Sequence, residues 1–149
     1  MAKYEEGAKV TLLANTDSVN LADGSLKVIP YDNTGEDDLW LWANIQLALR
    51  YDTSAPAAGT AVAELYLLPK VSNYPEGSSS LTPQAALLVG VFESRDPKTH
   101  ETEHLILPAI PLTPAEMYFV IKNISGETFA GNNGGTGWAF HIIPFRTQK

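Results

Sequence analysis

Cysteine is absent from this chain of 149 residues. Its absence excludes a disulfide framework and any metal site built on thiolates, and it leaves the redox compartment undecided. Long apolar runs are absent as well, because no stretch approaches the ~20 residues that a membrane-spanning helix needs. The first ten residues, MAKYEEGAKV, contain no apolar core of a signal peptide. We therefore expect a protein made in a cytoplasm, with no membrane partner.

Basic residues are few, since ten Lys and Arg face 17 Asp and Glu and the net charge is −7. The imbalance is concentrated in residues 1–38, where eight acidic and three basic residues give a net charge of −5. A protein that binds nucleic acid normally presents a basic face that displaces counterions from phosphates. The sequence therefore predicts no nucleic-acid partner, and an anionic membrane surface is disfavoured for the same reason.

The apolar spacing of an amphipathic helix is not found along the chain, and strand signals dominate instead. In residues 39–51 every second side chain is apolar or aromatic: Leu39, Leu41, Ala43, Ile45, Leu47, Leu49 and Tyr51. Such alternation predicts a strand with one face on a core and the other toward water or a partner. Residues 61–68 alternate in the same way, with Glu64 and Tyr66 on the outward face.

Further strands are predicted from composition and turn signals. Residues 85–92 are apolar on both faces, which predicts a strand covered on both sides. Prolines deny donors to a β-ladder, so residues 105–110 are expected at a sheet edge or a bulge, and residues 138–145 at an edge or a strand end. Residues 117–124 (MYFVIKNI) are rich in β-branched and aromatic residues and predict another strand. Two weaker candidates, 9–13 and 25–31, complete the set.

Eight short strands without an intervening helix predict one all-β domain over residues 1–149, an antiparallel β-sandwich of about eight strands. Eight is also the strand count of a jelly roll, in which two four-stranded sheets lie face to face, so we expect a jelly-roll-like arrangement. Residues 1–38 are expected to contain the first strands and an acidic N-terminal arm. Four loops are long enough to contact a partner: 52–60, 69–84, 94–100 and 125–137.

The sharpest motif is HETEH at residues 100–104, which matches the H-E-x-x-H of zinc peptidases. In those enzymes the two histidines lie one helical turn apart, and the glutamate activates the metal-bound water. Here Asp96-Pro97 precedes the motif and the surrounding pattern is that of strands. In a strand His100, Thr102 and His104 share one face, so the zinc geometry is lost. We expect a polar, solvent-facing turn.

Other chemistries have weaker support. A cupin-like metal site needs histidines two apart, but His100 and His104 are four apart and His141 is the one other histidine. Ser125-Gly126 lacks the G-x-S-x-G pattern of a nucleophile elbow. A calcium site in the acidic stretch 32–38 (DNTGEDD) is an alternative to a solvated turn. The sequence therefore assigns no catalytic, cofactor-binding or metal-binding residue, and it predicts that the protein is not an enzyme.

Three aromatic side chains are candidates for an interface: Trp40, Trp42 and Tyr66. Trp40 and Trp42 fall on the outward face of the strand predicted at 39–51. Tryptophans in such a place either stack on sugar rings, as in carbohydrate-binding modules, or are buried against another subunit. A third interpretation is that the opposite sheet or an N-terminal segment covers them.

With the strands placed, the chain resembles the capsid decoration proteins, also called cement or head auxiliary proteins, of tailed bacteriophages. The resemblance extends over about residues 40–148. The matching segments are 55–59 (APAAG), 64–69 (ELYLLP), 73–77 (NYPEG), 88–92 (LVGVF), 95–96 (RD), 110–112 (IPL), 119–123 (FVIKN) and 143–148 (IPFRTQ).

The resemblance implies a non-enzymatic structural protein that binds the assembled phage head and stabilises it. Its implied partners are the major capsid protein and other copies of itself, as a dimer or trimer, and its implied location is the surface of the virion. It implies no cofactor, and it places HETEH in a variable hairpin. The alternative function is a carbohydrate-binding β-sandwich module that uses Trp40, Trp42 or Trp138.

Overall fold

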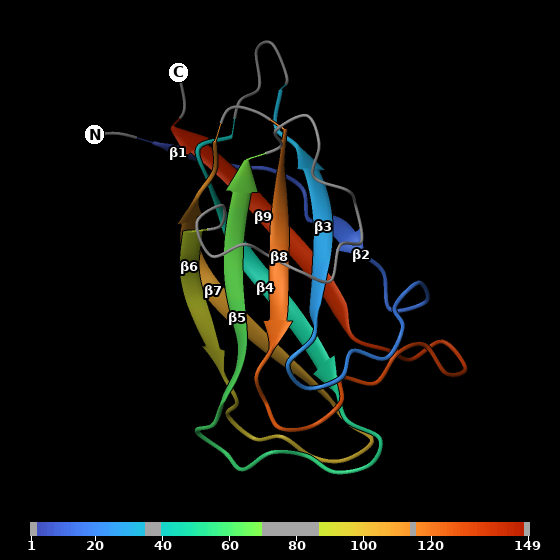
Figure 1. The fold of residues 1–149 in the computed structure, drawn as a ribbon. Helices are drawn as coiled ribbons and strands as arrows, with labels where there is room; N and C mark the ends of the chain where they lie inside the picture. The colour runs from blue at the N-terminus through green and yellow to red at the C-terminus, as the bar shows by residue number, and fades with distance from the viewer. Residues whose placement is uncertain (1–2, 35–39, 70–86, 114–115, 148–149) are drawn as a thin grey trace.

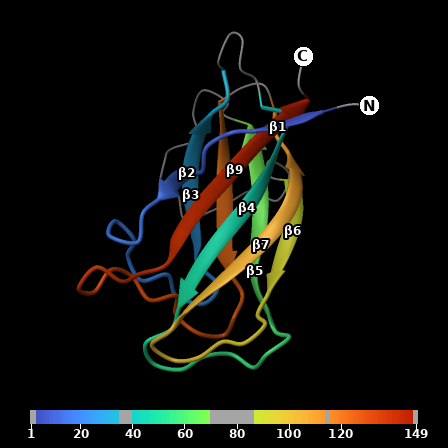
Figure 2. The same cartoon turned by 180° about the vertical axis from the view of Figure 1, so that it is seen from behind.

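A computed structural model describes residues 3–34, 40–69, 87–113 and 116–147. Within these ranges all regular structure is β, and no helix is long and apolar enough to cross a membrane. The sheet in front in Figure 1 has the order β3 (Leu26–Asp32), β8 (Glu116–Asn123), β5 (Ala61–Pro69) and β6 (Leu87–Glu93). The sheet in front in Figure 2 consists of β1 (Tyr4–Glu6), β9 (Ala139–Thr147), β4 (Trp42–Arg50) and β7 (Thr102–Pro111), with β2 (Val10–Leu13) also on β9.

Every strand pair in the two sheets is antiparallel. The sheets lie face to face, and their strands run obliquely to one another (Figure 1). The predicted antiparallel β-sandwich is therefore confirmed, with nine strands in place of about eight. The additional strand is β1, at the start of the segment predicted to form an acidic arm. It pairs with the last three residues of β9, from Tyr4 opposite Thr147 to Glu6 opposite Phe145.

The strand pairs are nested along the sequence. β5 pairs with β6, β4 with β7, β3 with β8, and β2 with β9. Each of these pairs encloses the preceding one, as in a long hairpin folded over on itself. The chain therefore alternates between the two sheets at every step from β2 to β9 except between the neighbours β5 and β6.

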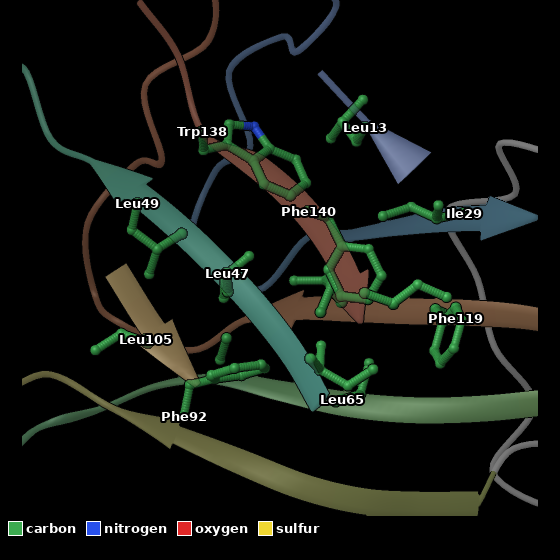
Figure 3. Packing of buried hydrophobic residues seen from close by; sticks show 14 of the residues in the cluster. Leu13, Ile29, Leu47, Leu49, Leu65, Phe92, Leu105, Phe119, Trp138 and Phe140 are labelled. Carbon is green, nitrogen blue, oxygen red and sulfur yellow. The ribbon is translucent and has the colours of Figure 1, made fainter. Parts of the chain in front are cut away.

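The alternation predicted for residues 39–51 is confirmed for the core-facing positions from Ala43 onward, but it is wrong just before β4, where Leu41 is 42% exposed and the Trp40 ring packs against the main core. Ala43, Ile45, Leu47 and Leu49 on β4 are fully buried, and Tyr51 is nearly so. These side chains belong to one cluster with those of the opposite sheet, among them Leu65, Phe92 and Phe119. Figure 3 shows Leu47 and Leu49 of β4 in this cluster. Since each fully buried large apolar side chain contributes about 1.5–3 kcal/mol, this layer is the main source of stability.

The strand that is buried on both faces is β8. Met117, Phe119 and Ile121 point into the main core, whereas Tyr118 and Val120 belong to a second apolar cluster on the other face of the sheet, with Val28 and Leu68. The prediction of a doubly covered strand at 85–92 is wrong for its described part. β6 is an edge strand, and of its apolar side chains only Phe92 is buried.

Proline positions were informative for β7 and misleading for β9. β7 lies at a sheet edge and contains a bulge, as predicted. β9 instead lies inside its sheet, between β4 on one side and β1 and β2 on the other. Pro144 is tolerated there because the Pro144 carbonyl accepts the N–H of Gly7, in the break between β1 and β2. A residue's N–H and C=O point to the same side of a strand, so the missing donor faces this break.

A buried amide at the end of β8 joins the loop before β3 to the loop after β8. Asn123 is fully buried, and its Nδ2 donates to the carbonyls of Leu21 and Glu127 at 2.9 and 2.7 Å. Its Oδ1 accepts the backbone N–H of Ser125 at 2.9 Å and the Ser125 hydroxyl at 2.7 Å. One side chain therefore satisfies four backbone or hydroxyl groups that would otherwise lose water without a partner.

Replacement of Asn123 with leucine removes these four hydrogen bonds while keeping a side chain of similar size. Unpaired buried polar groups are costly, so we expect the free energy of unfolding to fall by about 2–4 kcal/mol. Urea denaturation followed by tryptophan fluorescence measures the change. Asn133→Ala is the control, because Asn133 is exposed and, among the described residues, only its backbone forms hydrogen bonds. This variant should shift stability by less than about 0.5 kcal/mol. Equal effects in both variants would contradict the role given to Asn123.

Candidate functional site

The outer face of the sheet that contains β4 has a groove that we name the aromatic groove. Its volume is about 430 Å³. Its lining residues come from β1, β4, β7 and β9: Tyr4, Glu6, Trp42, Asn44, Ala109 and Phe145. It combines three rings with a carboxylate and an amide.

Strand register brings the three rings together. Trp42 lies directly opposite Phe145 across the β4–β9 pair, and the two rings stack with centroids 5.7 Å apart and planes inclined by 23°. Tyr4 on β1 meets both rings edge-on, at 6.3 Å from Trp42 and 6.4 Å from Phe145. Such offset and edge-to-face contacts add stability beyond the area buried. The N-terminal strand thus covers part of Trp42, in agreement with one of the interpretations open at the sequence level.

A β-bulge shapes the opposite wall of the groove. The β4–β7 register shifts between Ala43 and Ile45, and Ala109 adopts a left-handed backbone conformation with φ of 54°. Asn44 supports this conformation, because its Oδ1 accepts the N–H of Ala109 at 3.0 Å. A non-glycine residue in this region is strained, and such residues concentrate at functional sites.

Two polar groups of the groove are left without an internal partner among the described residues. The carboxylate of Glu6 forms no hydrogen bond or ion pair with a described residue, whereas the neighbouring Glu5 accepts from Arg146 at 3.0 Å. Asn44 uses its Oδ1 for Ala109, and its Nδ2 donates to no described group. The groove therefore presents an anionic acceptor and an amide donor beside an aromatic floor.

The predicted interface residue Trp40 is separated from Trp42. It precedes β4, and its backbone is held by Asn33, which accepts the Trp40 N–H at 3.2 Å and donates to its carbonyl at 2.9 Å. Its ring packs against the main core, and the Arg146 guanidinium lies 4.8 Å from the ring centroid. Trp40 is thus half-covered within the protein and does not line the aromatic groove.

Tyr66 lies on the outer face of the other sheet, where it packs against the second apolar cluster. Its hydroxyl donates to Glu64 Oε2 at 2.7 Å. This hydrogen bond, together with burial and the charge of Glu64, raises the pKa of Tyr66 to about 12. Trp138, considered for sugar stacking, is 1% exposed, and its Nε1 donates to the carbonyl of Val19. It has no free ring face and is excluded from that role.

The HETEH residues do not form a zinc motif. β7 begins at Thr102, and His100 lies before it with a left-handed φ of 66° and Nδ1 3.4 Å from an Asp52 carboxylate oxygen. His104 instead lies near His141, across the small side chain of Ala48 on β4. We name this hollow the histidine groove; its volume is about 450 Å³ and its polar lining includes Thr11, Asn15, Thr102 and Thr136.

No group of three or more potential metal-ligating side chains occurs among the residues that the structure describes. The calcium alternative at 32–38 falls partly on residues 35–38, which lie outside the described ranges. Within those ranges, Asp32 accepts hydrogen bonds from the N–H and hydroxyl of Thr34, as in an ordinary polar turn. Ser125 is also accounted for, because its hydroxyl lies within hydrogen-bond distance of Asn123 Oδ1 and of the Glu127 carbonyl and accepts the Glu127 N–H.

A third surface was not found at the sequence level. β6 and β7 are edge strands of different sheets that lie side by side, and Figure 2 shows them together at one side of the sandwich. Four apolar side chains there are largely exposed, and we name them the apolar edge: Leu87 (67%), Leu88 (47%), Val91 (39%) and Ile106 (59%). The apolar pattern of 85–92, interpreted as double burial, was the available signal for this surface.

Models of known protein families and the curated proteins were both compared with this chain, and neither comparison gave a match.

Glycine at position 109 tests the strain in the wall of the aromatic groove. Glycine adopts a positive φ without the steric cost that alanine bears, so Ala109→Gly should raise the free energy of unfolding by up to about 1 kcal/mol. Ala22→Gly is the control, because Ala22 is exposed and has no positive φ. That control should lower stability or leave it unchanged. A destabilised Ala109→Gly variant would argue against strain at the bulge.

The histidine groove should make stability depend on pH. Burial lowers the pKa of His141 below its ordinary value of 6.5, and the positive charges of Lys9 and His104 lower it further. The Thr11 hydroxyl, 2.9 Å from His141 Nδ1, can donate to the neutral ring. The unfolded chain therefore takes up a proton before the folded one as pH falls, so this contribution is complete above about pH 6.5 and is lost below it.

We expect His141→Gln to reduce the loss of stability on acidification below about pH 6.5, as measured by urea denaturation across that range. In the wild-type chain, an NMR titration should give His141 a pKa below 6.5. The variant His104→Asn should move that pKa upward, because it removes one of the charges that lower it. An unchanged pKa in His104→Asn would disprove the interaction between the two rings.

Proposed function

We propose that this protein is a non-enzymatic structural subunit that decorates the assembled capsid of a tailed bacteriophage and stabilises it. Its proposed partners are the major capsid protein and other copies of the same chain, and its proposed location is the outer surface of the virion. Three things support the proposal: the resemblance over about residues 40–148, the rigid two-sheet architecture, and above all the apolar edge.

The apolar edge is the observation on which the proposal depends. An edge strand offers unpaired N–H and C=O groups, and soluble proteins normally protect such edges with charge, proline or a covering segment. Here exposed leucine, valine and isoleucine side chains lie on two adjacent edge strands. Val91 and Ile106 line one hollow on these strands, and exposed apolar side chains that lie together are typical of surfaces that another protein covers. A capsid surface is a partner that would cover this edge permanently.

The strand order supports a jelly-roll topology, which we propose as the finer description of the fold. In that topology the chain forms a long antiparallel hairpin whose two arms are wrapped into facing four-stranded sheets. The nested pairs β2–β9, β3–β8, β4–β7 and β5–β6 follow this scheme, with β1 as an addition that extends the edge beside β9. A stiff shell of this kind suits a subunit that must hold its contact surfaces in fixed positions.

Repetition would compensate for a modest contact area. Each subunit needs to bind the shell only weakly if the copies also contact each other, because a copy that is linked to a bound neighbour meets its own site at a high effective concentration. The net charge of −7 is compatible with this role, since such a surface has no need to approach the packaged genome.

Co-sedimentation with shells assembled from the major capsid protein encoded nearest to this gene tests the proposal. The wild-type protein should sediment with the shells at a saturable ratio. The variant Ile106→Lys should weaken binding by about tenfold or more, because it places a charge in the middle of the apolar edge. Folding should be unaffected, since Ile106 is 59% exposed.

Val19→Lys is the matched control, because Val19 is 67% exposed but lies outside the apolar edge. It should bind the shells as the wild type does. Failure of the wild-type protein to sediment with the shells would disprove the decoration role. An equal loss of shell binding in both lysine variants would show that the apolar edge is not the binding surface.

A further inference from the structure

We propose that the aromatic groove binds the pyranose ring of a neutral carbohydrate. This inference goes beyond attachment to a capsid, because the rings of the groove lie on β1, β4 and β9, whereas the apolar edge lies on β6 and β7. A subunit on a virion surface would have access to glycans of a host cell, but the binding itself rests only on the chemistry of the groove.

The floor of the groove matches the apolar side of a sugar ring. A pyranose has faces formed by C–H bonds, which pack on aromatic rings, and a rim of hydroxyl groups that need hydrogen-bond partners. Tyr4 is 67% exposed, and Trp42 and Phe145 are each only partly buried, so ring surface remains accessible from outside. Aromatic rings with one accessible side provide large contact area at low cost in conformational entropy.

The polar groups of the groove match the hydroxyl rim. Each sugar hydroxyl can donate and accept a hydrogen bond, so a site needs both kinds of partner. The Glu6 carboxylate supplies acceptors and the Asn44 Nδ2 supplies donors, and neither group has a partner among the described residues. Small-molecule sites have this composition, with a mainly apolar lining and a few polar groups that fix orientation.

The groove is also preformed. Trp42 and Phe145 are held by their register across β4 and β9, and Asn44 is oriented by its hydrogen bond to the Ala109 N–H. A site that is already ordered before binding loses less entropy when the ligand arrives. Its volume of about 430 Å³ lies within the range of small-molecule sites.

The test uses the full chain labelled with ¹⁵N and the methyl glycosides of glucose, galactose, mannose and N-acetylglucosamine as probes. At least one should shift the NMR signals of the Trp42 indole and the Asn44 side-chain amide, with a dissociation constant on the order of millimolar. Tyr4→Ala and Trp42→Ala should each weaken that binding by about tenfold. Tyr4→Ala keeps the test decisive if Trp42→Ala does not fold, because Tyr4 is exposed.

Tyr66→Ala is the matched control, since it removes an aromatic ring from the outer face of the other sheet, and it should leave sugar binding unchanged. Glu6→Gln separates a sugar from a cation, because glutamine still accepts hydrogen bonds and should weaken sugar binding only a few-fold. Tetramethylammonium is the probe for the alternative ligand, a cation. Its binding would depend on the negative charge of Glu6 and would be lost in Glu6→Gln.

Four results would overturn the inference. They are the absence of shifts with all four glycosides, binding that survives Tyr4→Ala, binding by tetramethylammonium alone, and concentration-dependent self-association through the groove that Tyr4→Ala abolishes. None of these results bears on sedimentation with capsid shells, so the two proposals fail separately.

Discussion

The register of β4 between β7 and β9 determines what the rest of the molecule can do. Side chains alternate across a strand, so a shift by one residue would exchange the core face and the outer face. In the observed register Ala43, Ile45, Leu47 and Leu49 close the core, while Trp42 meets Phe145 on the outside. The core and the aromatic groove thus depend on the same pairing.

That pairing also gives the aromatic groove a packed base. A fully buried layer beneath the outer face prevents the rings of the groove from sinking inward, because close-packed interiors leave few voids. The Asn44 contact to Ala109 adds a fixed point at the bulge. Strain there is compensated by the hydrogen bonds and packing around it, which is the usual way in which proteins hold an unfavourable backbone conformation. A stiff surface suits both of the proposed functions.

Local sequence patterns were sufficient to predict most strands, but they did not predict which strands pair with one another. The alternation along residues 39–51 predicted the face of each core residue in β4 correctly. A strand that is buried on one face has an apolar residue at every second position. β1 has three residues and no such pattern, so only its pairing with β9 reveals it. Pro144 wrongly predicted a sheet edge. The break between β1 and β2 that accommodates this proline has no signal in the sequence around it.

The candidate site was less predictable than the fold. Trp42 was identified as an outward aromatic residue, but its partners Phe145 and Tyr4 are far away in the sequence and meet it only through strand pairing. The left-handed Ala109 has no local signal, since alanine rarely adopts such a φ. The apolar composition of residues 87–91 predicted burial in the core. An apolar segment on a binding surface has the same composition as one in a core, so the sequence does not distinguish the two.

The nested strand pairing has a consequence for synthesis. β2 pairs with β9, so at a translation rate of ~5–20 residues per second its partner follows roughly 6–25 s later. During that time the earlier strands can form only the inner pairs, and the apolar faces that β9 will complete remain open to solvent or to a neighbouring nascent chain. The β2–β9 pair is therefore the last of the nested pairs that can form, which favours slow completion of the sandwich.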